Sequence, residues 1–460
     1  MQLKILLIQP PPRTIEYETI VVPPLGLAYL AATLRREGHD VAVLDAFALQ
    51  LDWDAFTKCV AEAKAELIGV TGMTPVVDNS LRALKIARPH CKYLVFGGAH
   101  VSAFKQKVFE QAPEIDFAMY GECEIAFANA VRTLESGGDP SGLPGVITKG
   151  KLNDAADLIP DLDTLPFPAR DLLPNDRYRY ALGRGGRVTT MFTSRGCPYG
   201  CAFCDKSTFT SKWRARSAEN ILAEADEIVG KYGVHSIIIY DDLFTVDKKR
   251  VREFCEGIIR RGVKMDWKCE GRVNIVDDEM LALMKRAGCS MIAYGVESAN
   301  QHGLDYLNKG TTPDMARAAF AATRRAGIRT MGYFILGIPV ETYDDARRTI
   351  DFALELKADY AQFSVLSPFP NTPIYDDAIA KGWYHEVDAQ NPLDKDLKRP
   401  AIISENWDEQ RLRDILREAH RHFYLRPSRL FKEIFSVRSL PQLKGKLAAG
   451  VKLLSWSRKP

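Results

Sequence analysis

The chain has 460 residues, of which 46% are hydrophobic and 26% are charged, and its formal net charge at pH 7 is +3. This composition is typical of a globular protein and excludes a disordered or fibrous chain. The small net charge predicts no general affinity for polyanions, and no apolar run reaches the roughly 18 residues of a membrane-spanning helix. A chain of this length is expected to form two or three domains.

The first residues, MQLKILLIQPPP, form an apolar run that prolines end after a few positions. Such a run is too short for a signal peptide and is typical of a first β-strand. We therefore expect a cytoplasmic protein, in which the nine cysteines are reduced. In that compartment a tight cluster of cysteines favours metal binding or catalysis over disulfide formation.

Residues 1–140 alternate short apolar runs with helical patterns, which predicts βαβ units around a parallel sheet. Five strands are expected, at residues 3–9, 40–46, 67–73, 92–98 and 115–121. The stretch PLGLAYLAATLRREGH lies between the first two, and its apolar spacing predicts a helix that ends near Gly38. This layout is that of a flavodoxin-like (Rossmann-like) doubly wound domain, in which ligands bind at the carboxyl ends of the strands.

The rest of the chain divides into three further regions. Residues 141–186 are rich in Gly, Pro and Asp and are predicted to form a linker. A second alternating series occupies residues 187–385, with strands expected at 187–194, 235–242, 264–271, 290–298, 330–337 and 360–367. Six strand–helix units predict a (βα)6 partial TIM-type barrel, whose active site lies at the carboxyl ends of its strands. Residues 386–460 break this pattern and are expected to form a small, mainly helical region.

The tail from Leu425 onward contains nine Lys or Arg residues and a single Glu433, interleaved with apolar side chains. This content is typical of a segment that lies on anionic lipid, and it predicts a contact with the inner face of a membrane. A basic helix packed across a soluble core is the alternative. A nucleic-acid partner is not expected, because the charge sits in one short tail and no RNA-binding module is visible.

Three cysteines crowd into the stretch GCPYGCAFC, directly after the first strand of the second series. They are Cys197, Cys201 and Cys204. A structural zinc site needs four ligands, and the sequence has no second CxxC or paired HxxxH to complete one. A redox CxxC leaves Cys197 without a role. The remaining hypothesis is an iron–sulfur cluster held by three thiolates, with one iron open to an exogenous ligand.

The CxxxCxxC spacing, with the aromatic Phe203 before the last cysteine and a barrel strand before the first, resembles the radical S-adenosylmethionine superfamily. The resemblance implies that the open iron of a [4Fe–4S] cluster, held by these three cysteines as metal ligands, chelates S-adenosylmethionine. It further implies that an electron passing through the cluster cleaves this cosubstrate to a 5′-deoxyadenosyl radical.

The motifs IIIYDD, CEGRVN, GVES and FILGIPVET follow one another along the barrel and resemble the cosubstrate-binding strand ends of that superfamily. The likeness implies that the acidic pair holds the methionine amino group, that the Glu–Arg pair meets the ribose or carboxylate, and that the glycine strand borders the adenine. The residues placed there are Asp241, Asp242, Glu270, Arg272, Glu297, Ser298 and Gly337. Each has an ordinary alternative, because Asp caps helices, buried charges pair with each other, and glycine forms turns. SPFPNTPIY resembles the segment that closes such barrels, with Asn371 where a left-handed turn tolerates it in place of glycine.

A flavodoxin-like domain ahead of such a barrel resembles the cobalamin-dependent, B12-binding-domain branch of the superfamily. The stretches PPLGLAYLAATLRREGHDV, GVTGMTP, FGGAHVS and DFAMYGECE carry this likeness. It implies cobalamin as a further cofactor, with strand-end glycines permitting close approach and threonines able to bond its nucleotide tail. The residues placed there are Thr71, Gly72, Thr74, Gly97, Gly98 and His100.

The first loop of this domain departs from the D-x-H-x-x-G motif of other cobalamin proteins, since it reads QPPPRTI and has no histidine to ligate cobalt. Three roles are open for His100. It could ligate cobalt, it could contact a phosphate or the corrin edge, or it could be an ordinary hydrogen-bonding loop residue. Glu122 and Glu124 in GECE are expected at a helix N-terminus, where carboxylates are favourable.

The resemblance implies methyl transfer to an unactivated carbon of a lipid-like substrate (terpenoid, hopanoid or isoprenoid) or of another small molecule. A radical oxidative cyclase of the same family, acting on a tetrapyrrole or a lipid, uses the same motifs and is the alternative. A corrinoid or iron–sulfur sensor without turnover is a third hypothesis, which the acidic strand ends argue against. A flavodoxin or ferredoxin is the expected reducing partner.

Overall fold

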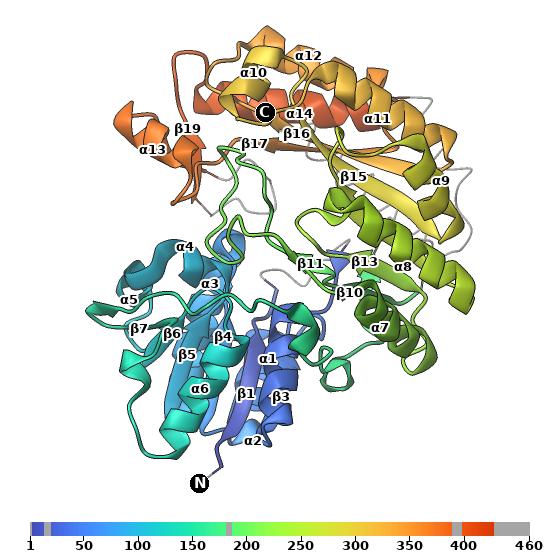
Figure 1. Ribbon diagram of the computed structural model, residues 1–460. Helices are drawn as coiled ribbons and strands as arrows, with labels where there is room; N and C mark the ends of the chain where they lie inside the picture. The colour runs from blue at the N-terminus through green and yellow to red at the C-terminus, as the bar shows by residue number, and fades with distance from the viewer. Residues whose placement is uncertain (1, 13–19, 181–185, 389–397, 427–460) are drawn as a thin grey trace. The chain divides into compact units, whose positions relative to one another are not determined.

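The computed structural model describes residues 2–12, 20–180, 186–388 and 398–426, and the chain forms two compact units. The first unit consists of Met1–Cys197 and Lys206–Ile237, and the second of Pro198–Asp205 and Ile238–Pro460. Figure 1 gives the order of the elements along the chain. The short segment that carries Cys201 and Cys204 thus belongs to the second unit, whereas Cys197 belongs to the first.

The first unit contains a seven-stranded sheet in the order β3-β1-β4-β5-β6-β7-β8. Its five parallel strands are β1 (Lys4–Gln9), β3 (Asp40–Asp45), β4 (Leu67–Thr71), β5 (Tyr93–Gly97) and β6 (Phe117–Met119). Numbered along the chain, these five run 2-1-3-4-5, which is the flavodoxin-like order. All five strands fall where the sequence predicts them.

Two short antiparallel strands extend this sheet beyond β6. They are β7 (Val146–Thr148), which pairs with β6, and β8 (Lys151–Leu152), which pairs with β7. Both lie in the segment that the sequence predicts as a linker. Val146 and Ile147 are fully buried, so pairing with β6 and burial stabilise a run that is too short to give a strand signal of its own.

Helices cover both faces of the first sheet, as the alternation along β1 requires. Ile5 and Leu7 belong to a core shared with α1 (Leu25–Arg36) and α6 (Glu124–Glu135). Leu6 and Ile8 point to the opposite face and pack in the core of α2 (Trp53–Ala63), α3 (Val77–Ala87) and α4 (Ala99–Phe104). The sheet is therefore doubly wound, and Gly38 stands in the left-handed region (φ +93°) just after α1, as predicted.

The second series of strands forms a sheet in chain order, β10-β13-β14-β15-β16-β17. The strands are β10 (Val188–Met191), β13 (Ser236–Ile239), β14 (Asp266–Gly271), β15 (Cys289–Glu297), β16 (Arg329–Leu336) and β17 (Tyr360–Val365). Neighbouring strands from β14 to β17 are parallel. These six strands confirm the predicted series, and α7 (Ala218–Gly230) precedes β13.

In the second unit, one face of the parallel strands packs on helices and the other is more polar. The helices are α8 (Lys248–Arg261), α9 (Asp278–Arg286), α11 (Pro313–Arg325), α12 (Tyr343–Glu355) and α14 (Glu409–Tyr424) (Figure 1). Trp267 of β14 packs edge-to-face on Phe254 of α8, with ring centroids 5.6 Å apart. Because side chains alternate along a strand, Lys268 and Glu270 of β14 point to the face away from these helices.

The end of the chain is mainly helical, as expected, and it also contains a short hairpin that the sequence does not predict. A hairpin of β18 (Tyr384–Asp388) and β19 (Lys398–Ile402) precedes α14. Asn371 has φ +66°, which confirms the predicted left-handed turn. The basic tail beyond residue 426 lies outside the described residues. In the part of the chain that the structure describes, no helix is both long and apolar enough to cross a membrane.

Candidate active site

The cysteine motif lies in a loop that leaves β11 (Ser194–Arg195) and returns through β12 (Arg214–Ala215). The two strands pair antiparallel, so that the first and last parts of the loop start from one place. Gly196 has φ +80°, and a Cβ at this position would lie 2.5 Å from the carbonyl oxygen of Lys212. Glycine is required here, because any side chain would collide with the returning backbone.

The three cysteines of this loop differ in exposure. Cys197 and Cys201 are half-buried, whereas Cys204 is exposed. The Nζ atom of Lys206 donates to the carbonyl oxygen of Cys197 at 3.2 Å, and the backbone N–H of Cys204 donates to that of Cys201 at 3.3 Å. Among the described residues, no three His, Cys, Asp or Glu side chains are already gathered as a metal site. Three thiols within one short loop are nevertheless the donor set that iron–sulfur clusters use.

Arg272, which follows β14, lies beside the second cysteine. Its Nη1 atom is 3.8 Å from Sγ of Cys201, and its guanidinium lies 3.9 Å from the ring centroid of Tyr199. The side chain is 6% exposed, and Nη2 donates to the carbonyl oxygen of Lys309. A buried cation at this position attracts negative charge on a cluster with thiolate ligands or on a carboxylate bound next to it.

The acidic pair after β13 divides between two environments. Asp241 is buried and lies 3.7 Å from Nη2 of Arg250 on α8, whereas Asp242 is exposed. The first carboxylate is therefore part of a buried ion pair within the second unit, which is one of the ordinary alternatives to a ligand role. The second faces solvent.

Glu270 gathers with two other polar side chains on the face of the strands away from the helices. The hydroxyl of Tyr333 donates to Oε1 of Glu270 at 3.2 Å, and Nζ of Lys268 lies 4.0 Å from the same oxygen. Burial raises the pKa of Glu270 and lowers the pKa of Lys268, because desolvation disfavours each charged form. This face offers hydrogen-bonding groups to a polar part of a ligand.

Glu297 ends β15 in the left-handed region, with φ +67°, and is already paired. Nζ of Lys309 lies 2.6 Å from Oε1 of Glu297, and both side chains are at least nine-tenths buried. Gly295 makes room for this pair, since a Cβ there would lie 2.4 Å from the same carboxylate oxygen. The Lys309 ammonium also lies 5.7 Å from the ring centroid of Phe203, which places the predicted aromatic residue beside this ion pair.

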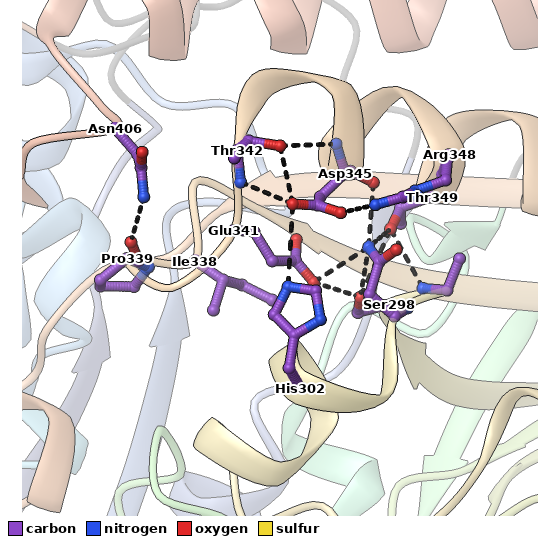
Figure 2. Close-up of polar contacts among 12 residues, drawn as sticks. Ser298, His302, Ile338, Pro339, Glu341, Thr342, Asp345, Arg348, Thr349 and Asn406 are labelled. Carbon is purple, nitrogen blue, oxygen red and sulfur yellow. Dashed lines mark hydrogen bonds and ion pairs between the residues drawn. The ribbon is translucent and has the colours of Figure 1, made fainter.

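Ser298, the next residue, belongs to a buried network that we call the carboxyl network: Ser298, Asn300, Glu341, Asp345 and Thr349. Figure 2 shows Ser298 donating its hydroxyl to Oε1 of Glu341. Nδ2 of Asn300 donates to the same oxygen at 3.2 Å, while Oε2 has no hydrogen-bond partner among the described residues. Burial raises the pKa of Glu341, and the two hydrogen bonds only partly offset this effect. The network connects the end of β15 to the first turns of α12.

The backbone after β16 is held by the C-terminal region. Gly337 has φ +76°, and a Cβ there would lie 2.4 Å from a methyl carbon of Leu412 on α14. Nε1 of Trp407 donates to the carbonyl oxygens of Ile338 and Glu341, each at 2.9 Å. Gly337 is therefore required for the packing of α14. The backbone that follows it is held by Trp407, which precedes that helix.

In the first unit the predicted cobalamin residues meet at the carboxyl ends of β4 and β5. Gly72 donates to the carbonyl oxygen of Gly97 at 2.8 Å, and the backbone N–H of His100 donates to that of Gly72 at 3.0 Å. At Gly98 (φ +99°) a Cβ would lie 2.6 Å from the Gly72 oxygen and 2.7 Å from Oγ1 of Thr71. Both loops are thus packed on each other and depend on glycine.

His100 is buried and both of its ring nitrogens are occupied. Nδ1 lies 3.2 Å from Oγ1 of Thr74, and Nε2 lies 2.8 Å from Oε1 of Gln111. The ring also stacks on Phe104 at a centroid distance of 4.4 Å. Burial lowers the pKa of His100, because desolvation disfavours the charged imidazolium. In this arrangement His100 fixes the loop after β4 to α4 and the residues beyond it.

The same edge also exposes apolar side chains. Met73 is 55% exposed and Val76 is 43% exposed, directly after Gly72. These side chains can offer apolar contact to a ligand beside the glycines. A flat, largely apolar macrocycle suits this edge, because the glycines have no side chains to prevent its close approach to the backbone and the apolar side chains are exposed.

Sequence reasoning missed several buried cations, and those nearest the proposed site include Lys309, Arg195 and Arg214. Each is paired with a carboxylate distant in sequence, at Glu297, Glu124 or Glu122. A single Lys or Arg in a loop has no periodicity or spacing that distinguishes it from a surface charge. The only signal for Arg195 and Arg214 is that they flank the cysteine loop.

Two family models match the chain, the Radical SAM superfamily over residues 191–353 and the B12 binding domain over residues 19–131. An uncharacterized methyltransferase of Pyrococcus horikoshii is 33% identical over 442 residues, which are 94% of this chain and 95% of that protein. The chain therefore belongs to the radical S-adenosylmethionine superfamily, in its cobalamin-dependent branch, and is an enzyme of the methyltransferase family found there.

Other relatives carry different names. The anaerobic magnesium-protoporphyrin IX monomethyl ester cyclase of Rubrivivax gelatinosus is 28% identical, over 88% of this chain and 74% of that protein. The hopanoid C-3 methylase of Methylococcus capsulatus is 27% identical, over 80% of this chain and 71% of that protein. Family membership therefore does not specify the substrate.

Two solved structures share the fold. The methyltransferase TsrM of Kitasatospora setae, with cobalamin and a [4Fe–4S] cluster bound, superposes with a TM-score of 0.75 at 19% identity, over 93% of this chain and 90% of that one. The cobalamin-dependent radical enzyme OxsB, with aqua-cobalamin and S-adenosylmethionine bound, has a TM-score of 0.74 at 18% identity, over 99% and 72%. The fold class predicted from sequence is confirmed, and the predicted cofactors are those of this family.

Proposed function

We propose that this protein transfers a methyl group to an unactivated carbon of a small-molecule substrate. The observation that carries the proposal is the cysteine loop with the buried Arg272 beside Cys201, 3.8 Å from its sulfur. The full-length likeness to a methyltransferase of Pyrococcus horikoshii supports methyl transfer as the reaction. When bound, the cluster with S-adenosylmethionine supplies a 5′-deoxyadenosyl radical, and cobalamin supplies the methyl group.

The residues of the loop and of the neighbouring strand ends have separate tasks in this proposal. Cys197, Cys201 and Cys204 hold the cluster and leave one iron without a protein ligand. Arg272 supplies positive charge beside the second cysteine. The Lys309–Glu297 pair and Phe203 form one polar and aromatic wall within the second unit, suited to the amino-acid end of the cosubstrate.

In the first unit, the edge of β4 and β5 holds cobalamin. The backbone at Gly72, Gly97 and Gly98 stays low enough for a macrocycle to approach, and Met73 offers apolar contact. His100 supports this edge through Thr74 and Gln111. Gln111→Ala removes the hydrogen-bond partner of the His100 Nε2 atom and leaves that nitrogen free to bind cobalt. A change in the visible spectrum of bound cobalamin would then show that His100 can act as a cobalt ligand.

For the substrate we propose a lipid-like molecule, a terpenoid, hopanoid or isoprenoid, that meets the enzyme at a membrane surface. The basic and apolar tail after Leu425 supports it, as does the hopanoid C-3 methylase among the relatives. The polar face around Glu270 and Tyr333 would then bind a hydroxyl or a similar group of that substrate. Flotation with anionic vesicles tests the membrane contact, and equal flotation of a chain ending at Tyr424 would refute it.

A radical oxidative cyclase is the second candidate, and the Rubrivivax gelatinosus relative is the observation that favours it. The two reactions differ in the product. With S-adenosylmethionine that carries a deuterated methyl group, a methyltransferase gives a product with the label, whereas a cyclase gives a product that has only lost hydrogen. Mass analysis of extracts from cells with and without the gene makes the same distinction for the natural substrate.

The radical step itself is tested without any substrate. Full-length protein, reconstituted anaerobically with iron and sulfide and then reduced, is expected to convert S-adenosylmethionine to 5′-deoxyadenosine. Cys201→Ala is expected to abolish this product, whereas Cys59→Ala, on a helix of the first unit, is a matched control that retains it. Absence of 5′-deoxyadenosine from the unaltered protein would contradict the proposal and favour a sensor without turnover.

A further inference from the structure

The cysteine loop begins and ends on two buried arginines. Arg195 is the last residue of β11 and Arg214 the first of β12, and the two lie opposite each other in the antiparallel pair. They are 3% and 6% exposed. Every residue of the cysteine motif lies between them in the chain, and Cys197 is only two residues from Arg195. The position of these two arginines therefore sets where the loop starts and ends.

Arg214 is held by Glu122 through two hydrogen bonds. Nη2 donates to Oε1 of Glu122 at 2.5 Å, and Nη1 donates to Oε2 at 2.8 Å. Oε2 also accepts from the backbone N–H of Ile159 at 2.9 Å, and Nη1 of Arg214 donates to the carbonyl oxygen of the same residue at 2.7 Å. The Glu122 side chain has no exposed surface. Bidentate Arg–carboxylate pairs restrict orientation as well as distance, so this pair fixes the end of the loop.

Arg195 is held in a similar way by the neighbouring carboxylate. Its Nη2 atom donates to Oε1 of Glu124 at 2.5 Å, and its Nη1 atom lies 3.6 Å from Oε1 of Glu122. The guanidinium also packs against two rings, 5.3 Å from the centroid of Tyr29 and 5.1 Å from that of Phe209. Phe209 belongs to the cysteine loop itself. We call Glu122, Glu124, Arg195 and Arg214 the charged network.

Both carboxylates belong to the edge of the sheet at which cobalamin is expected. Glu122 follows β6 by three residues, and Glu124 is the first residue of α6. The preceding Gly121 donates its N–H to Oγ of Ser102 on α4 at 3.0 Å, and Ser102 in turn lies within hydrogen-bonding distance of the Gly98 carbonyl oxygen at 3.4 Å. A continuous chain of contacts within the first unit thus connects the glycine edge to both ends of the cysteine loop.

We propose that Glu122 and Glu124 are positioning residues for the iron–sulfur cluster. They do not touch the cluster, but through Arg214 and Arg195 they fix the two ends of the loop that carries the three thiolates. Metal ligands must be held in the right orientation, and loss of a group that orients them typically lowers metal affinity by about 10- to 100-fold. The inference rests on the proposed role of Cys197, Cys201 and Cys204 as cluster ligands.

The test uses the full-length chain reconstituted anaerobically with iron and sulfide. Glu122→Gln keeps the shape of the side chain but removes the charge that holds Arg214. We expect a loss of cluster affinity of about 10- to 100-fold, as for other groups that orient metal ligands. We also expect an altered EPR spectrum of the reduced cluster and a shifted reduction potential, while cobalamin binding is retained. Glu122→Asp, which restores the charge, is expected to recover part of the signal.

A matched control separates positioning from stability. Glu224 on α7 is also fully buried between two arginines of the first unit, Arg170 at 2.5 Å and Arg216. Glu224→Gln removes a similar buried charge but leaves Arg195 and Arg214 paired. Its cluster content and EPR spectrum are expected to match those of the unaltered protein at a temperature where both variants are folded.

The outcomes decide the proposal in either direction. Iron content and an EPR spectrum that are unchanged in Glu122→Gln would overturn it, as would an equal change in Glu224→Gln. If Glu122→Gln does not fold, Glu124→Gln and Arg195→Lys give the same readouts with smaller expected changes. Cys197→Ala tests the premise separately: cluster loss there, with retention in the glutamate variants, refutes only the positioning role.

Discussion

In the first unit Glu122 is buried against two arginines, whereas in the second unit Glu341 is buried against a hydroxyl and an amide. Both carboxyl groups are withdrawn from water. In the charged network, arginines of opposite charge surround Glu122. In the carboxyl network, neutral groups donate hydrogen bonds to Glu341, and burial raises the pKa of Glu341. The comparison shows two ways of burying a carboxyl group: opposite charges surround Glu122, whereas neutral donors surround Glu341 and burial disfavours its charged form.

The largest effect is expected when one partner of the charged network is removed. Arg214→Met leaves Glu122 with only the more distant Arg195, and an uncompensated buried charge costs about 3–5 kcal/mol of unfolding free energy. Urea denaturation at neutral pH measures it. The double variant Glu122→Leu with Arg214→Met is expected to regain much of the loss, because the buried charges that remain, Arg195 and Glu124, are paired with each other. A loss no larger than that of an exposed pair would show that the network is not energetically distinct.

A steric change in the carboxyl network is expected to have the next largest effect. A Cβ at Gly303 on α10 (Gln301–Tyr306) would lie 2.0 Å from Oε1 of Glu341, so Gly303→Ala displaces that carboxyl group. Overpacking of this kind costs about 1–3 kcal/mol. Gly26→Ala on α1 is the control, because open space surrounds that position and alanine favours helices by up to about 1 kcal/mol. Equal thermal shifts in the two variants would contradict the expectation.

The third prediction concerns pH. The pKa of Glu341 in the folded protein is raised above its ordinary value of 4.5, so folding favours the protonated form. The stability that this group contributes is complete below that pH and is lost as pH rises through the raised pKa. A tenfold difference in proton affinity between the folded and unfolded protein corresponds to about 1.4 kcal/mol. Glu341→Gln cannot ionise, so its stability relative to the unaltered protein is expected to improve from about pH 4.5 upward. Parallel stability profiles of the two proteins would contradict this.

The smallest effect on stability is expected for an Arg–Glu ion pair that is exposed to solvent. Glu355 and Arg317 form an ion pair at 2.6 Å, with side chains 53% and 45% exposed. Glu355→Gln is expected to cost at most about 1 kcal/mol, and added salt should reduce that cost because solvent already screens the pair. A cost as large as that of Arg214→Met would mean that burial does not account for the difference between the networks.

Much of the fold follows from local patterns. The eleven predicted strands are present because each carries enough buried apolar residues to give a signal within its own segment. The strands β7 and β8, and the hairpin of β18 and β19, carry no such signal, since they depend on a neighbouring strand for stability. In the flavodoxin-like order of the first sheet, strands that follow one another in the chain are neighbours except for β3 and β4.

The candidate site likewise contains residues that local sequence patterns indicate and residues that they do not. The cysteine spacing and the strand-end motifs were visible in the sequence, because the residues that carry them are close together in the chain. Lys309, Arg195 and Arg214 were not, because each acquires its meaning from a carboxylate elsewhere. The glycine at Gly337 was predicted to border a ligand, but its missing side chain makes room for Leu412, which no local pattern indicates.

The sequence by itself determined the order of the two domains, the series of strands and the three thiols, since these depend on periodicity and spacing along the chain. Only the tertiary structure decided which charges meet, because Glu122 and Arg214 are 92 positions apart and Arg195 and Glu124 are 71 apart. Electrostatic pairing acts through distance in space and leaves no periodic trace in the sequence.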